Sequence, residues 1–286
     1  MSVISPGAAM NKLTVVLCSM LCISCAALSV VAQNAGANQP STGASVRLEP
    51  VKQLRKGVDK WPMIAAPANP AEQHVNAVLT LLNRTLSTAL VECDQNARES
   101  FKQLGDDAPK GQDPTAGDWS RTVKVTMTGP RFLSIVATDE TSCGGAHPDS
   151  DTIAMVFDLT TGRPVNWMAL IAPSAKATTF SDSITDGTKV GALIVPAMKP
   201  ILLAAAASEC KDSFEDPQSY QFWPDAARGR LIALAFDLPH AVAACADEIP
   251  LTPDQARKLG FDEALLGAIE QAHRQSAAAP SGSAKH

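Results

Sequence analysis

The sequence is poor in aromatic residues and shows no excess of basic ones. Only 5% of its 286 residues are Phe, Trp or Tyr, and 24 Lys and Arg stand against 29 Asp and Glu. A formal net charge of −5 is unlike the basic composition of nucleic-acid-binding proteins, so no nucleic-acid partner is expected. With 17 glycines and 20 prolines, the chain has too little of either residue to be collagenous or wholly disordered. The length allows one large globular domain or two small ones.

Several catalytic signatures are also missing. The sequence has no HExxH zinc motif, no phosphate-binding Gly-Lys-Ser/Thr loop, no GxSxG elbow and no dinucleotide fingerprint. We therefore predict no catalytic residue, no cofactor and no resident metal. Trp119, Trp167 and Trp223 lie in or beside predicted strands, where core packing is favoured over stacking on sugars.

An apolar run near the N-terminus predicts export. Residues 13–32 are almost wholly apolar, and Val30 and Ala32 occupy positions −3 and −1 of a cut after Ala32. We therefore expect residues 1–32 to be a cleavable signal peptide, whether translation starts at Met1 or at Met10. The mature chain is then periplasmic or secreted, without membrane contact after cleavage.

Two alternatives exist for this run. It is long enough to be an uncleaved membrane anchor, although its small, Ser- and Cys-rich end favours cleavage. A lipoprotein is disfavoured because the Leu that usually stands three positions before the lipidated cysteine is missing ahead of Cys25. After the run, we expect a flexible leader at 33–45, a single α+β domain at 46–275 and a disordered tail at 276–286.

Removal of the signal peptide leaves four cysteines, Cys93, Cys143, Cys210 and Cys245. An even number in an oxidising compartment predicts two disulfides. Four cysteines allow three connectivities, and the count alone does not choose among them.

The first strong helix signal begins at Asn69. Asn69 is a good N-cap, Pro70 suits the first helical position, and Glu72 completes a capping-box-like spacing. Apolar residues then recur at three- and four-residue steps and continue as far as Cys93. The pattern predicts an amphipathic helix that ends near Cys93.

The pattern after this helix changes to a period of two. Strands are predicted at 122–127, 131–137 and 152–159, followed by a hairpin that returns through Val165 and Trp167. Short connections predict an antiparallel meander, because parallel strands need long crossovers. Residues 190–209 predict a helix that Pro196 and Pro200 must kink or whose start they must delay. Strands are then predicted at 220–223 and 231–236, and two helices start at Thr252 and Asp262. The fold class is thus α+β, an antiparallel sheet with helices packed on it.

One loop carries the candidate site. Its Gly144, Gly145, His147 and Asp149 form a candidate binding or structural turn, because paired glycines allow positive φ and close backbone approach. His240 is a further candidate, at the break after the strand at 231–236.

Two sharper interpretations of this loop remain open beside a structural turn. Cys143 could be a thiolate nucleophile with His147 as its base. Alternatively, Cys143, His147, His240 and Cys245 could form a Cys2His2 zinc site, because their Cys-x3-His and His-x4-Cys spacings nearly mirror each other.

Three segments carry a family resemblance. Residues 129–135 (GPRFLSI), 143–148 (CGGAHP) and 157–163 (FDLTTGR), with Val165, resemble an extracytoplasmic domain of unknown function. RsiV-type anti-sigma factors and PdaC-type peptidoglycan deacetylases share this domain. The resemblance covers roughly Val75 to Ile269 and implies an α+β module that binds lysozyme in RsiV-type proteins.

The departures from the family qualify this resemblance. No sigma-binding segment is recognised before the apolar run, no deacetylase domain fits in the chain, and Ser142-Cys143 replaces the aromatic often found before Gly-Gly. The resemblance therefore implies a stand-alone, exported, non-enzymatic binding module of the bacterial cell envelope. Its expected partners are lysozyme, another envelope protein or a peptidoglycan-related ligand. The alternative is an envelope hydrolase or zinc protein that uses His147 and His240, and the oligomeric state stays open.

The predicted elements favour one disulfide pairing. Cys93 at a helix end and Cys143 after a strand would join helix to sheet, and Cys210 and Cys245 have a similar arrangement. We therefore predict the bridges Cys93–Cys143 and Cys210–Cys245.

Overall fold

The computed structural model describes residues 45–104, 117–144, 148–183, 189–214, 218–236, 238 and 245–278. Within these ranges it contains two β-sheets and four α-helices, which confirms the α+β class. The expected signal peptide at 1–32, most of the leader and the tail from 279 onward lie outside the described residues.

The first sheet has six strands in the order β1-β2-β3-β4-β5-β6. Their bounds are β1 Gln53–Arg55, β2 Val58–Asp59, β3 Asp118–Thr128, β4 Phe132–Ser142, β5 Asp149–Asp158 and β6 Arg163–Pro164. The predicted antiparallel meander is confirmed for β3, β4 and β5. The sheet also contains a parallel pair outside the predicted meander, because β2 pairs with β3 in parallel through Val58 and Arg121. This pairing comes from a segment for which no strand was predicted.

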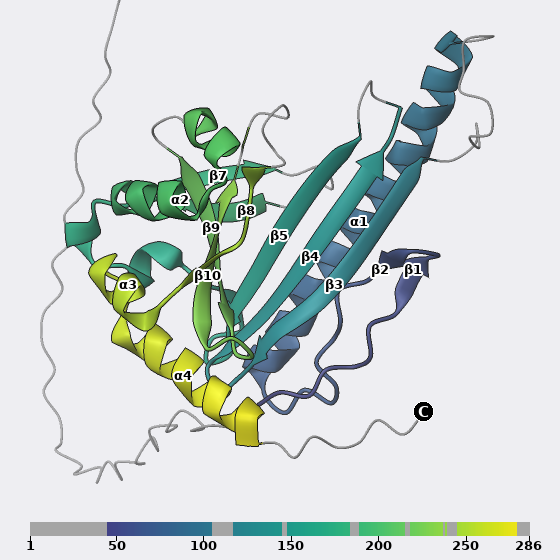
Figure 1. Cartoon of the computed structure of the whole chain (residues 1–286). Coiled ribbons are helices and arrows are strands. Elements are labelled where there is room, and N and C mark those ends of the chain that lie inside the picture. The colour runs from purple at the N-terminus through teal and green to yellow at the C-terminus, as the bar shows by residue number, and fades with distance from the viewer. Residues whose placement is uncertain are drawn as a thin grey trace, which may run out of the picture. The chain divides into compact units, whose positions relative to one another are not determined.

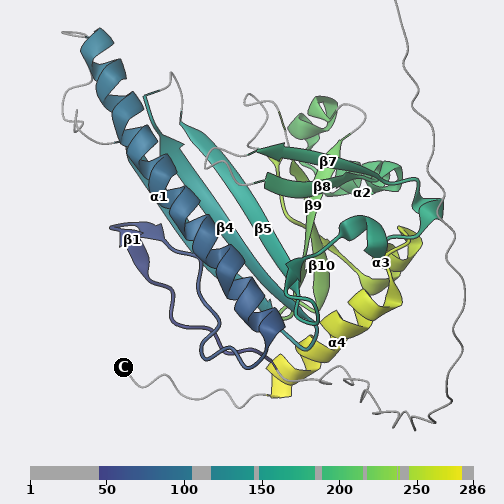
Figure 2. The same ribbon diagram turned by 180° about the vertical axis from the view of Figure 1, so that it is seen from behind.

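Helix α1 (Pro70–Leu104) covers one face of this sheet (Figure 2). The predicted start is confirmed, since Asn69 Oδ1 accepts from Glu72 N at 3.0 Å and Glu72 Oε1 accepts from Asn69 Nδ2 at 2.8 Å. The predicted end at Cys93 is wrong, because the helix continues for three more turns. Residues 94–104 are mostly good helix formers with few buried side chains, so the apolar pattern fades before the helix does.

The second sheet has five strands in the order β11-β10-β9-β8-β7, which makes two sheets where one was predicted. Their bounds are β7 Thr178–Ser183, β8 Lys189–Ile194, β9 Ser219–Asp225, β10 Arg230–Phe236 and β11 Ile249–Leu251. The helix predicted at 190–209 is wrong in its first part, which is β8, but its delayed start is confirmed, because α2 occupies Lys199–Ala205. Short apolar runs do not distinguish a buried strand from a helix by periodicity, and this run has β-branched residues and ends before Pro196.

Helices pack against the second sheet. They comprise α2 (Lys199–Ala205), α3 (Pro253–Lys258), α4 (Glu263–Ala278) and the 3-10 helices η2 (Trp167–Leu170), η3 (Pro173–Ala175), η4 (Pro196–Met198) and η5 (Ser208–Ser213). In Figure 1, α4 runs obliquely to β10, which it contacts. The predicted strand through Trp167 is replaced by η2, although the tryptophan is buried as expected. Helix α4 also takes in Ser276 to Ala278, the start of the expected tail.

Buried polar side chains join the two sheets. Gln221 of β9 is 1% exposed, and its Oε1 accepts from Ala154 N at 3.0 Å while its Nε2 donates to Thr152 O at 2.7 Å. This amide therefore takes the place of a neighbouring strand on the edge of β5. Thr126 of β3 donates from Oγ1 to Pro224 O at 2.8 Å and accepts at its own carbonyl from Ala226 N. Both contacts hold β9 against the first sheet.

Candidate functional site

Residues 45–65, which we call the strap, run beside α1 as two arms that pair with each other. The outer arm includes β1, and the inner arm includes β2 and the residues that follow it. The arms pair where Glu49 N donates to Met63 O and again where Lys60 N donates to Lys52 O, each at 2.8 Å. Between these points Pro50 and Pro62 stand in opposite arms. Because proline has no backbone N–H, pairing is interrupted there and the outer arm parts from the inner one.

Two asparagines of α1 hold the inner arm. Asn83 accepts from Trp61 N at 2.9 Å and donates to Trp61 O at 3.1 Å, and Asn76 does the same for Ile64 at 2.8 and 2.9 Å. Each amide thus satisfies both backbone groups of one residue, as a neighbouring strand would. The two asparagines are seven helical residues apart, a rise of about 10.5 Å, and Trp61 and Ile64 are three extended residues apart, about 10 Å. The spacing along the helix therefore matches the spacing along the inner arm.

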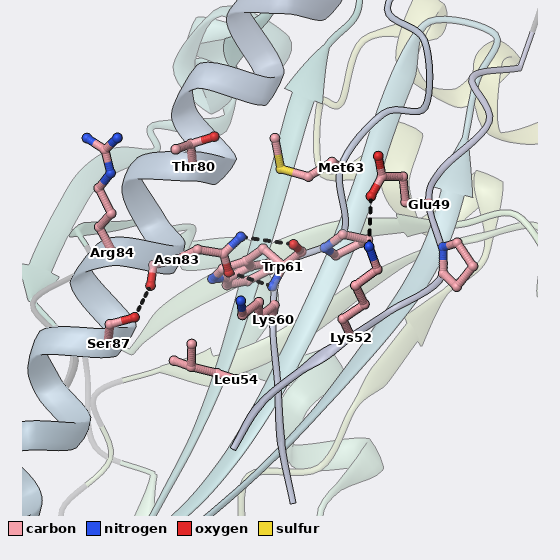
Figure 3. Close-up of a pocket in the computed structure, with 12 residues that line it drawn as sticks. Glu49, Lys52, Leu54, Lys60, Trp61, Met63, Thr80, Asn83, Arg84 and Ser87 are labelled. Atoms are coloured by element: carbon pink, nitrogen blue, oxygen red, sulfur yellow. Dashed lines mark hydrogen bonds and ion pairs between the residues drawn. The ribbon is translucent and has the colours of Figure 1, made fainter. Parts of the chain in front are cut away.

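A groove of about 390 Å³ lies between the strap and α1, which we call the strap groove (Figure 3). The inner arm forms its floor, and the outer arm and one stripe of α1 form its walls. The lining residues are Glu49, Pro50, Lys52 and Leu54 of the outer arm, Lys60, Trp61, Pro62 and Met63 of the inner arm, and Thr80, Asn83, Arg84 and Ser87 of α1. The volume is within the range typical of small-ligand sites, roughly 300–1,000 Å³.

The rim of the strap groove is cationic. The strap holds five basic and two acidic residues in a chain whose net charge is −5. Within the described residues, neither half-buried Lys60 nor exposed Arg84 has an ionic partner. Lys52 lies 3.7 Å from Glu49, but such exposed pairs contribute little. Figure 3 shows Lys60 between the helix and the outer arm. The groove thus offers positive charge that the described chain does not neutralise.

A buried polar cluster supports the floor of the groove. Trp61 is 1% exposed, and the guanidinium carbon of Arg121 lies 5.0 Å from the centre of its ring. Arg121 Nε lies 3.4 Å from Asp139 Oδ1, which also accepts from Trp119 Nε1 at 2.8 Å. Packing and charge therefore fix the floor before any ligand arrives, which lowers the entropy lost on binding.

Gly144 and Asp149, the described residues of the candidate turn, do not line this groove. Gly144 has φ +92° and lies against α1, where a Cβ would come within 2.5 Å of Ser100 Oγ and 2.6 Å of Asn96 O. Ser100 Oγ donates to Gly144 O at 2.6 Å. Asp149 begins β5 at the surface, where its Oδ1 accepts from the adjacent Ser150 N. Gly144 therefore packs closely against α1.

The other candidates, Gly145, His147 and His240, lie outside the described residues. The cysteine-based interpretations can still be judged. Cys93 bonds to Cys143 with S–S 2.01 Å, and Cys210 bonds to Cys245 with S–S 1.97 Å, the pairing that the predicted elements favoured. A disulfide sulfur has no thiolate to attack a substrate or ligate zinc. The Cys143 nucleophile and the Cys2His2 site are therefore wrong for this oxidised chain.

The segments that carry the family resemblance also have structural roles. Arg131 donates from Nε and Nη2 to Asp158 Oδ2 at 3.2 and 3.0 Å, and Asp158 Oδ1 accepts from Thr160 N at 2.8 Å. Gly162, with φ +70°, faces the carbonyl of Ala71 in the first turn of α1 so closely that a Cβ would collide with it. The ion pair thus joins the start of β4 to the end of β5, and Gly162 packs the following turn against α1.

Two further features are absent from the described residues. No cluster of three or more His, Cys, Asp or Glu side chains there could hold a metal ion. Among the same residues, no helix has the length and apolarity needed to cross a membrane.

Comparison with solved structures supports the fold. A DUF3298 family member from Bacteroides fragilis superposes with a TM-score of 0.50 at 12% identity, over 79% of this chain and 98% of that one. The chain has a DUF3298-type fold. A DUF3298 family protein from Pseudomonas aeruginosa matches with a TM-score of 0.36 at 13% identity, over 77% of this chain and 95% of that one. No family model and no curated protein matches the sequence.

Sequence reasoning missed the strap and the groove. Two signals were present in the sequence. Basic residues cluster between Arg47 and Lys60, and Asn76 and Asn83 stand seven residues apart beside the apolar stripe of the predicted helix. Neither signal indicates which residues the side chains contact. The asparagines bond to backbone groups of the strap, and only the tertiary fold places the strap beside them.

Proposed function

We propose that this chain is an exported binding module of the bacterial cell envelope and that it binds its ligand in the strap groove. The proposal extends the resemblance to the domain of RsiV-type and PdaC-type proteins. The observation that carries it is the preformed groove, whose rim holds Lys60 and Arg84 without ionic partners among the described residues. A cationic groove favours an anionic ligand, so we propose a peptidoglycan-related ligand rather than a cationic lysozyme at this place.

The disulfides support export. Cys93–Cys143 ties α1 to the end of β4, and Cys210–Cys245 ties η5 to the segment before β11. Such bridges persist in the periplasm and outside the cell but are rare in the reducing cytosol. Together with the apolar run at 13–32, they favour a chain that is exported before it oxidises.

Production of the full chain in a Gram-negative host tests export. We expect periplasmic protein that begins at Gln33, because the favoured cut follows Ala32. Peptide mapping without reductant should show the 93–143 and 210–245 links. Cytosolic protein that retains residues 1–32, or a 143–245 link, would contradict the proposal of an exported, disulfide-stabilised module.

Co-sedimentation with purified peptidoglycan sacculi tests binding. The mature protein should sediment with sacculi, and binding should weaken as salt rises from about 50 to about 200 mM, because exposed charges are screened over about 10 Å. A parallel pull-down with immobilised lysozyme separates the two ligands. Retention by lysozyme without sedimentation on sacculi would overturn the peptidoglycan assignment, and failure of both would remove the envelope-binding function.

A further inference from the structure

We propose that the strap groove takes the carboxylate-bearing stem peptide of peptidoglycan in an extended conformation. This inference rests on the proposed function and names the part of the ligand that the groove contacts. It is carried by the length of the groove, the hydrogen-bonding groups on its helical wall and the charge on its rim.

The dimensions fit a short extended peptide. From Thr80 to Ser87 the helical wall of the groove spans seven residues, which is about 10 Å, or about three residues of extended chain. The volume of about 390 Å³ suits a ligand of this size and is too small for a folded protein domain.

The helical wall offers acceptors at both ends. Thr80 Oγ1 donates to Asn76 O at 2.8 Å, and Ser87 Oγ donates to Asn83 O at 3.0 Å. Each hydroxyl proton is thereby used within the helix, which leaves the hydroxyl oxygens as acceptors on the groove side. Backbone N–H groups of an extended peptide, about three residues apart, match these two oxygens.

The charges select a ligand with carboxylates. Lys60 is half-buried between the two walls, and Arg84 lies on the helical rim. A carboxylate that reaches Lys60 would neutralise a partly desolvated ammonium group. Arg84 can bind a second carboxylate by donating two parallel hydrogen bonds. Met63 and Leu54 line the same groove and provide apolar contacts for the methyl groups of the alanine residues at the ends of such stems.

The test is a calorimetric titration of the mature, disulfide-bonded protein with a synthetic stem tetrapeptide. A second peptide has the same sequence with every carboxyl group amidated. We expect the free-acid peptide to bind at least about tenfold more tightly than the amidated one, because charge-assisted hydrogen bonds are lost in the latter.

Charge-reversal variants locate the site. Arg84→Glu and Lys60→Glu should each weaken binding of the free-acid peptide by about tenfold, since each removes an attraction and adds a repulsion. The matched control is Lys258→Glu on α3, which makes the same change of net charge on a helix that packs against β10 and β11. It should change the affinity by less than about twofold, as expected for a distant exposed charge. Unchanged thermal unfolding checks that each variant is folded.

Three results would overturn the inference. They are equal affinity for the two peptides, equal loss in Lys258→Glu and Arg84→Glu, and no peptide binding by wild-type protein that sediments with sacculi. The last result would leave the proposed function standing and move the contact from the stem peptide to the glycan. Absence of binding to both sacculi and peptide would instead refute the peptidoglycan assignment in the proposed function.

Discussion

Replacing Asp139 with alanine is expected to lower the free energy of unfolding by about 3–5 kcal/mol, the usual cost of breaking a buried ion pair from one side. The side chain of Arg121 is 0% exposed, and Asp139 Oδ1 lies 3.4 Å from its Nε. The alanine variant would leave this guanidinium charge in the core and remove the acceptor of Trp119 Nε1. Urea unfolding monitored by circular dichroism measures the effect.

Two controls identify the cause of this loss. Asp254→Ala removes an exposed carboxylate that pairs with Arg257 at 3.1 Å, and it should cost less than about 1 kcal/mol. The double variant Arg121→Met with Asp139→Leu should regain at least about 2 kcal/mol relative to Asp139→Ala, because apolar replacement of a whole pair is often neutral. A cost for Asp139→Ala no larger than that for Asp254→Ala would show that the buried pair does not stabilise the fold as described.

Replacing Trp61 with alanine is expected to lower the free energy of unfolding by about 3–5 kcal/mol and to abolish ligand binding in the strap groove. Trp61 is 1% exposed, packs with α1 and the first sheet, and forms part of the floor of the groove. Truncation leaves a cavity beneath the inner arm that the proline-flanked strap cannot easily fill. The measurements are urea unfolding and co-sedimentation with sacculi.

Trp61→Phe is the matched control. Trp61 Nε1 is buried without a hydrogen-bond partner, so removal of its N–H loses no bond. The phenylalanine ring still fills most of the space and still faces the Arg121 guanidinium. We expect the free energy of unfolding to fall by about 1–2 kcal/mol, because the smaller ring leaves only a small cavity, and we expect sacculus binding to be retained. Similar losses in the Ala and Phe variants would contradict the packing role assigned to this ring.

Local signals explain which parts of the fold could be predicted from sequence. The start of α1 follows from Asn69, Pro70 and Glu72, which act within one helical turn, and the capping box at Thr252 and Gln255 is local in the same way. The strands β3, β4 and β5 are long, and few residues separate them in the sequence, so their antiparallel pairing needs little tertiary information.

The missed elements depend on contacts between distant residues. Strand β8 is a short apolar run that only its partners β7 and β9 identify as a strand. The strap has few residues in regular pairing and is held by side chains of α1, such as Asn83, which is 22 positions from Trp61. The candidate turn was singled out for its glycines, yet Gly144 serves close packing on α1. Glycine patterns indicate tight backbone geometry, and this geometry alone does not distinguish a ligand-binding turn from a turn that only supports the fold.

Hydrogen-exchange mass spectrometry with soluble muropeptides tests the central claim most directly. The strap is tied to α1 by a few hydrogen bonds, so it should open locally, and a ligand that binds only the closed form should slow this opening. We predict slower exchange at residues 49–63 and in the 80–87 stretch of α1, with no change in α3 and α4. Slower exchange confined to the second sheet, with the strap unaffected, would contradict the assignment of the strap groove as the binding site.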